Sequence, residues 1–317
     1  MSDRRGMSDR RGRRGLRVPP AVMRPGVRLI GRRCLNPALP WAVQRTRLAQ
    51  LTGTALLPHG TTVTEQTVAG LAADVVSSGP PGAKRTVVHF HGGGYCVGSA
   101  QMARAWAAHL SAQAGCRVVL PEYRLAPEHP HPSGLDDARA VIRAVYDKTE
   151  PSSVVVSGDS AGGGLALALL LSLRDEGQDL PAGCVLLSPW LDLGRDRRAD
   201  PGLVRQDVLL SPDWLDACAR AYADPADWAD PWVSPLGADH SGLPPLLIQS
   251  AVGELLAPDS RLMAASAQAA GVDVTYTRWP GMWHDFVLQA GLLAAADSAV
   301  AQAAWFVRKV TGFAGPE

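Results

Sequence analysis

The sequence predicts an α/β fold with a mostly parallel central sheet, helices on both faces and a helical cap. Three observations support this class. From about residue 84 onward, short apolar or β-branched runs alternate with longer helical runs, as in a parallel sheet whose strands are connected by helices. The run Val154-Val-Val156 leads through a glycine-rich turn directly into an Ala/Leu-rich helical stretch. Finally, 317 residues of 46% hydrophobic composition can enclose one large core.

The segment before the sheet divides into an arm and part of the cap. Residues 1–33 hold eleven arginines against two aspartates, and we expect residues 1–20 to be a disordered basic arm. Such an arm could bind nucleic acid or an anionic surface, but an unstructured leader is the favoured interpretation, so no nucleic-acid partner is predicted. Residues 21–55 are expected to form a cap segment of short helical pieces interrupted by Pro25, Pro37 and Pro40.

Residues 56–317 are expected to form the main domain. Residues 61–66 and 71–76 alternate as an antiparallel hairpin. A stretch at about 195–240, rich in Asp, Pro and Trp, is expected to be an insertion that completes the cap. Further strands are expected at 84–90, 116–120, 154–156, 184–187, 246–249 and 272–278, and helices at 41–51, 103–114, 135–148, 164–173, 213–222, 258–270 and 292–310.

The cysteine pattern and the hydropathy of the chain indicate its cellular compartment, its metal content and its relation to membranes. The five cysteines are scattered, odd in number and without a C-x-x-C pair, which argues against a disulfide framework and favours the cytoplasm. None has His or Asp neighbours at ligand spacing, so no metal site is predicted. No segment fits a secretory signal or an apolar membrane span, so we expect no stable membrane insertion.

The turn between strand and helix has the pattern G-x-S-x-G, Gly158-Asp-Ser-Ala-Gly162. This pattern places a nucleophilic serine, Ser160, on a tight turn that exposes its hydroxyl. The two glycines fit because larger side chains would collide across such a turn. The N-terminus of the following helix favours a negative charge beside the serine.

A nucleophilic serine needs a base, and His240 and His284 are the only histidines after Ser160. His284 follows the last predicted strand, from which a loop can bring its imidazole to the serine, so we assign it as the base. His240 lies in the polar run Ala238-Asp-His-Ser-Gly242 and is expected to be solvent-exposed.

The run His91-Gly-Gly-Gly94 at a predicted strand end suits an oxyanion site. Glycines allow backbone N–H groups to approach a developing negative charge. Gly92, Gly93 and the N–H of Ala161 are the expected donors. A phosphate-binding loop is the alternative, but the lysine of G-x-x-x-x-G-K-[ST] and the Rossmann spacing are missing.

Taken together, the motifs resemble those of hormone-sensitive-lipase-like carboxylesterases (bacterial family IV) of the α/β-hydrolase superfamily. The resemblance covers about residue 40 to the C-terminus. It implies carboxylic-ester hydrolysis without a cofactor under a helical cap, and a homodimer is an open expectation. The matching segments are 91–95, Tyr123-Arg-Leu-Ala-Pro-Glu128, 158–163, Ser188-Pro-Trp-Leu-Asp192, Asp230-Pro-Trp-Val-Ser-Pro-Leu236, Gly242-Leu-Pro-Pro245 and Gly281-Met-Trp-His284.

The triad acid departs from this family pattern. Relatives usually carry aspartate about thirty residues before the histidine, where this chain has Gly253, followed by Glu254. Glu254 is the first choice because it is adjacent and one methylene longer. Asp259, in a helix-capping sequence, and Asp192 are alternatives with more expected structural roles, and a site with no orienting carboxylate is a fourth possibility. Loss of the acid can cost ~10⁴ in turnover.

Other polar and aromatic residues have structural interpretations. Tyr123, Arg124 and Glu128 are expected to form a buried polar brace under the glycine loop. Asp159 is expected to fix a loop as a hydrogen-bond acceptor. Four tryptophans are expected to pack in the core or cap, with one or two of them beside an acyl pocket: Trp190, Trp214, Trp228 and Trp232.

The favoured function is a serine carboxylesterase for small to medium acyl esters, with Ser160 as nucleophile, His284 as base and Glu254 as acid. One alternative is an acyltransferase, deacylase or cyclase for a specialised metabolite with a degenerate triad. The other is a non-catalytic ligand-binding protein on the same scaffold, against which the retention of Ser160 and His284 counts.

Overall fold

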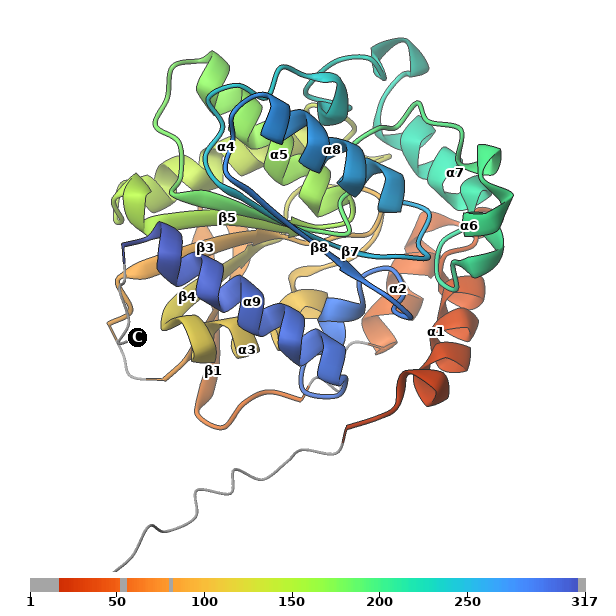
Figure 1. The fold of residues 1–317 in the computed structure, drawn as a ribbon, viewed down its shortest axis with the longest axis horizontal. Coiled ribbons are helices and arrows are strands. Elements are labelled where there is room, and N and C mark those ends of the chain that lie inside the picture. Colours follow the sequence, from red (N-terminus) through yellow and green to blue (C-terminus); the bar gives the residue numbers. More distant parts are fainter. Residues whose placement is uncertain (1–16, 52–55, 80–81, 313–317) are drawn as a thin grey trace, which may run out of the picture.

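The computed structural model describes residues 17–51, 56–79 and 82–312. In this part of the chain an eight-stranded sheet forms the centre, in the order β1-β2-β4-β3-β5-β6-β7-β8 (Figure 1). β1 pairs antiparallel with β2 and β2 with β4, whereas all other neighbours are parallel. The predicted hairpin and mostly parallel sheet are therefore confirmed. The strands are β1 (Thr61–Val68), β2 (Leu71–Ser78), β3 (Arg85–Phe90), β4 (Cys116–Pro121), β5 (Val154–Asp159), β6 (Gly183–Leu187), β7 (Leu246–Ala251) and β8 (Val274–Trp279).

Helices cover both faces of the sheet. α4 (Ser133–Tyr146), α5 (Ala161–Asp175) and α8 (Ala257–Ala269) lie on one face, and α3 (Ala100–Ala114) and α9 (Ala294–Val310) lie on the other (Figure 1). Successive side chains of a strand point to opposite faces of the sheet. In β5, Val154 and Val156 accordingly pack in one apolar core and Val155 packs in the other. Strands buried on both faces explain the unbroken apolar runs in the sequence.

Four further helices gather at one end of the sheet: α1 (Pro20–Cys34), α2 (Trp41–Leu51), α6 (Pro201–Gln206) and α7 (Pro212–Tyr222) (Figure 1). We call α1, α2 and residues 195–240 the cap. Its two parts are in contact, since the Trp214 indole N–H donates to Gln44 Oε1 at 2.9 Å. Residues 52–55 of the expected cap segment and residues 1–16 of the expected arm lie outside the described residues. Short 3₁₀ helices lie at η2 (Pro151–Ser153), η3 (Arg197–Ala199), η4 (Pro225–Asp227), η5 (Pro235–Gly237) and η6 (Phe286–Gln289).

The prediction that Pro25 interrupts the first helix is wrong, because α1 continues through it. A proline inside a helix deprives the carbonyl four residues earlier of its hydrogen bond. That carbonyl belongs to Ala21, and both Ala21 and Pro25 are exposed, so water can replace the missing donor.

The sheet topology brings distant segments to the cap end. β3, β5, β7 and β8 run parallel, so the loops that follow them leave from the same edge. Ligand sites in open α/β sheets form at this edge. Among the helices of the described residues, none is both long enough and apolar enough to cross a bilayer.

Candidate active site

Ser160 occupies the turn between β5 and α5, with a backbone φ of 54° that is strained for a non-glycine residue. The turn has no room for side chains on either side. A β-carbon on Gly158 would lie 2.1 Å from the Gly162 carbonyl oxygen, and one on Gly162 would lie 2.0 Å from the Phe90 carbonyl oxygen. The glycines at these two positions are therefore sterically required, as the sequence pattern indicates.

A continuous hydrogen-bonded chain leads from this serine to a buried carboxylate. Ser160 Oγ lies 2.9 Å from His284 Nε2, and His284 Nδ1 lies 3.2 Å from Glu254 Oε2. The histidine lies in the loop after β8 and the glutamate in the loop after β7. His284 is 2% exposed and Glu254 is fully buried. The three residues selected from the sequence thus come together in the geometry of a Ser-His-acid triad.

The two alternative carboxylates point elsewhere. Asp259 is fully buried in a bidentate ion pair with Arg197 of the cap, at 2.7 and 2.9 Å. Asp259 also accepts hydrogen bonds from the backbone N–H groups of Leu191 and Asp192. The Asp192 side chain accepts from Gly194 N–H at 3.1 Å. Asp259 therefore connects the cap to α8 and to the loop after β6, and Asp192 fixes a local turn.

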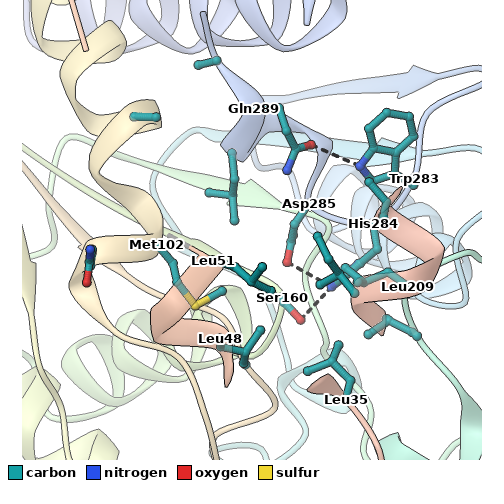
Figure 2. A pocket seen from close by; sticks show the side chains of 18 of the residues that line it. Leu35, Leu48, Leu51, Met102, Ser160, Leu209, Trp283, His284, Asp285 and Gln289 are labelled. Atoms are coloured by element: carbon teal, nitrogen blue, oxygen red, sulfur yellow. Dashed lines mark hydrogen bonds and ion pairs between the residues drawn. The ribbon is translucent and has the colours of Figure 1, made fainter. Parts of the chain in front are cut away.

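A further carboxylate, Asp285, lies on the serine side of the histidine ring. Its Oδ2 is 3.1 Å from His284 Nε2, the same nitrogen that faces Ser160 (Figure 2). The sequence analysis gave Asp285 no role. The available signal was an acidic residue directly after the proposed base; in the structure its backbone is left-handed, with φ 54°.

The buried charges shift one another's protonation. Burial raises the pKa of Glu254, against the opposing effect of His284. Burial alone would lower the pKa of His284, but Asp285 and Glu254 outweigh it, and the pKa lies well above the usual value. Burial also raises the pKa of Asp285 to about 7, with the charges of Asp159 and Glu254 acting in the same direction and His284 opposing them. The imidazolium is thus stabilised between two carboxyl groups.

The predicted oxyanion donors differ in whether their N–H groups already donate to another acceptor. Gly92 N–H already donates to Asp159 Oδ2 at 3.0 Å, which conflicts with the donor role expected for Gly92. The same bond gives Asp159 its expected place as a loop-fixing acceptor. In the described part of the chain, the N–H groups of Gly93, Gly94 and Ala161 donate to no protein acceptor. Gly93 also lines the pocket beside Ser160.

The expected polar brace is only partly correct. Tyr123 is buried and donates to the His91 carbonyl at 2.7 Å, which supports the glycine loop. Arg124 and Glu128 are exposed instead. The first pairs with Asp137 of α4 and the second with Arg45 of α2, because both side chains extend outward from the loop to neighbouring helices.

His240 is not solvent-exposed, contrary to the prediction from its polar surroundings. It is 1% exposed, and its ring nitrogens lie 2.9 Å from Ser266 Oγ and 2.9 Å from the Pro235 carbonyl oxygen. The cap insertion folds back over α8 here, so a residue in a polar stretch becomes an internal hydrogen-bonding group.

A cavity of about 250 Å³ opens beside Ser160, His284 and Asp285 (Figure 2). Its walls are mainly aliphatic and come from both the cap and the main domain. Of the four tryptophans that the sequence analysis considered for an acyl pocket, Trp214 lines this cavity. The aliphatic lining includes Ile30, Leu35, Leu48, Leu51, Met102, Leu209, Leu210 and Leu288. Such a surface suits an acyl or alkyl chain.

No group of three or more His, Cys, Asp and Glu side chains within residues 17–51, 56–79 and 82–312 is arranged to hold a metal ion. The expectation of a cofactor-free reaction stays a prediction. The five cysteines are buried and unpaired, as expected from their spacing.

Comparisons with known proteins agree with this fold. The family model described as alpha/beta hydrolase fold matches residues 87–288. LipR of Mycobacterium tuberculosis is 38% identical over 261 residues, covering 82% of this chain and 84% of its own. The acetyl-hydrolase of Streptomyces hygroscopicus is 38% identical over 229 residues, covering 72% of this chain and 77% of its own.

Solved structures extend the likeness to nearly the whole chain. An esterase of the bacterial hormone-sensitive lipase family matches with a TM-score of 0.86 and 32% identity, over 93% of this chain and 99% of that one. A hormone-sensitive lipase from a metagenome library matches with a TM-score of 0.87 and 30% identity, over 94% and 100% of the two chains. The chain therefore belongs to the α/β-hydrolase family, in its hormone-sensitive-lipase-like branch.

Proposed function

We propose that this protein is a serine carboxylesterase that cleaves esters of small to medium acyl groups through an acyl-enzyme intermediate. It is an ester-hydrolysing α/β hydrolase, since relatives across the comparison carry the names esterase and acetyl-hydrolase. The observation that carries the mechanism is the unbroken contact from Ser160 Oγ through His284 to Glu254, at 2.9 and 3.2 Å.

The proposed reaction begins when Ser160 Oγ attacks the ester carbonyl carbon and His284 Nε2 accepts the hydroxyl proton. Glu254 keeps the other ring proton on Nδ1 and stabilises the imidazolium. The N–H groups of Gly93 and Ala161, with that of Gly94, hold the negatively charged carbonyl oxygen. His284 then returns the proton to the departing alcohol, and water cleaves the acyl-serine by the same steps.

The apolar cavity supports an aliphatic acyl or alkyl group as the part of the substrate held next to the serine. The alternative of an acyltransferase, deacylase or cyclase rested on a missing triad acid. It is not favoured, because Glu254 lies where an acid is needed. A non-catalytic binding protein is not favoured either, since it has no need for a serine hydrogen-bonded to a buried histidine.

The test is hydrolysis of p-nitrophenyl acetate, butyrate and octanoate by the wild type, Ser160→Ala and the exposed-site control Ser298→Ala. The wild type and the control are expected to be active and to react with a fluorophosphonate probe, whereas Ser160→Ala does neither. Undiminished hydrolysis by Ser160→Ala would exclude the proposed nucleophile. An unreactive wild type would favour the binding protein.

Two finer proposals concern the protein's setting. The cysteine usage supports a cytoplasmic location, and the resemblance to the family supports pairing into a homodimer. Cell fractionation tests the first, and light scattering of the purified chain tests the second.

A further inference from the structure

Asp285 is placed to touch the substrate as well as the base. Both Asp285 Oδ2 and Ser160 Oγ face His284 Nε2, at 3.1 and 2.9 Å. Asp285 also lines the cavity (Figure 2). Its side chain thus lies at the point where the scissile ester must bind.

One oxygen of the Asp285 carboxyl group has no hydrogen-bond donor in its surroundings. Among the described residues that line the cavity, Asp285 and His284 are the only ones with ionisable acidic or basic side chains. The residue is 8% exposed, and its Oδ1 is buried without a hydrogen-bond partner. A buried carboxyl oxygen without a donor carries a desolvation cost, which a donor on a bound ligand would remove.

The reaction itself determines which part of an ester comes close to Asp285. The leaving oxygen must approach His284 Nε2 within hydrogen-bond distance to receive the proton. Asp285 Oδ2 contacts the same nitrogen at 3.1 Å, so these two oxygens lie within about 6 Å of each other. The carbonyl oxygen, in contrast, is directed to the N–H groups of Gly93 and Ala161. Asp285 therefore faces the alcohol half of the ester.

We propose that Asp285 binds a hydroxyl group on the carbon adjacent to the one that bears the leaving oxygen, so that the preferred substrates are partial esters of polyols. This inference rests on the proposed esterase mechanism and adds the class of alcohol. The hydroxyl keeps its proton throughout and serves only to hold the leaving group. The proton that moves is that of Ser160, through His284 to the ester oxygen.

A hydroxyl suits Asp285 better than an ammonium group does. Burial raises the pKa of Asp285 to about 7, so both of its forms occur near neutral pH. A hydroxyl can donate to the carboxylate and can accept from the protonated carboxyl, whereas an ammonium group can only donate.

The experiment compares 2-hydroxyethyl butyrate with 2-methoxyethyl butyrate, which cannot donate a hydrogen bond. Each kcat/KM is divided by the rate constant of alkaline hydrolysis to remove differences in intrinsic reactivity. The variants are Asp285→Asn, which keeps an acceptor oxygen, and Asp285→Gly, which removes the side chain. Both residues tolerate the left-handed backbone at this position. Asp273→Asn is the control, because Asp273 is exposed and lies just before the N-terminal end of β8, whereas Asp285 lies after its C-terminal end.

In the wild type and the control, the hydroxyethyl ester is expected to be preferred by roughly tenfold. The preference falls to near unity in Asp285→Gly and is largely kept in Asp285→Asn. Equal rates for the two esters in an active wild type, or an unchanged preference in Asp285→Gly, would overturn the assignment while leaving the esterase intact. Failure of the wild type to hydrolyse either ester or p-nitrophenyl butyrate would instead remove the proposed function, and this assignment with it.

Discussion

Replacing Glu254 by glutamine probes the proposed acid of the triad. Glu254 is fully buried, and its Oε2 lies 3.2 Å from His284 Nδ1. Water cannot take over its role, because the site is closed to solvent on that side. The glutamine amide can donate to Nδ1, which would place the ring proton on Nε2, where Asp285 accepts it. Nε2 could then no longer accept the serine proton.

Loss of the correct tautomer in Ser-His-acid triads lowers kcat by about 10⁴, and we expect a loss of about 10³ to 10⁴ for Glu254→Gln, with little change in KM. Glu254→Asp keeps the charge but withdraws it by one methylene, so a loss of about 10² is expected. Adding Asp285→Gly to Glu254→Gln should recover part of the loss, because the side chain that favours the wrong tautomer is gone.

The assay is steady-state hydrolysis of p-nitrophenyl butyrate, with circular dichroism and thermal unfolding to show that each variant is folded. A folded Glu254→Gln protein within threefold of wild-type kcat would refute the assignment of the acid. The search would then turn to a site with no orienting carboxylate.

Three further predictions concern other parts of the structure. Asp285→Asn removes one of the charges that raise the pKa of His284; since the base must be neutral to act, the acidic limb of the kcat/KM profile should move to lower pH, and an unmoved limb contradicts this. Arg197→Met removes the bidentate partner of the buried Asp259 and leaves it only the ion pair with Arg195 at 3.3 Å, so the free energy of unfolding in urea should fall by about 3 kcal/mol; a change below about 1 kcal/mol would show that the Arg197–Asp259 pair is not structural. Gly162→Ala places a β-carbon 2.0 Å from a backbone carbonyl oxygen, so the melting temperature should collapse or no soluble protein should form, and a wild-type melting curve would disprove the steric argument.

The fold and the nucleophile could be predicted because their signals are local. Strands buried on both faces need continuous apolar runs, and Ser160 needs small residues at fixed spacing, so both leave a pattern in the chain. For the acid, the sequence made Glu254 the first choice but left Asp259, Asp192 and a site with no orienting carboxylate open. Spacing alone could not decide among them, because the decision depends on Arg197, whose ion pair with Asp259 forms only when the cap folds onto the sheet.

The wrong or missing predictions concern residues whose environment is determined by tertiary contacts and not by their neighbours in the sequence. His240 looks exposed in its polar stretch but is enclosed by the returning cap insertion. Gly92 looks like a free donor, yet Asp159, distant in sequence, accepts its N–H. Asp285 was missed because no periodicity of the sequence encodes the conformation of the loop that brings it to His284, in which Asp285 itself is left-handed. Each of these features requires knowledge of how separate segments meet.

The most direct test of the central claim is mass spectrometry of the protein after rapid acid quenching of its reaction with p-nitrophenyl butyrate. The account predicts a butyryl group on the peptide that contains Ser160, which disappears as the substrate is consumed and is absent from Ser160→Ala. Turnover with no acyl adduct, or an adduct on a different residue, would contradict the mechanism.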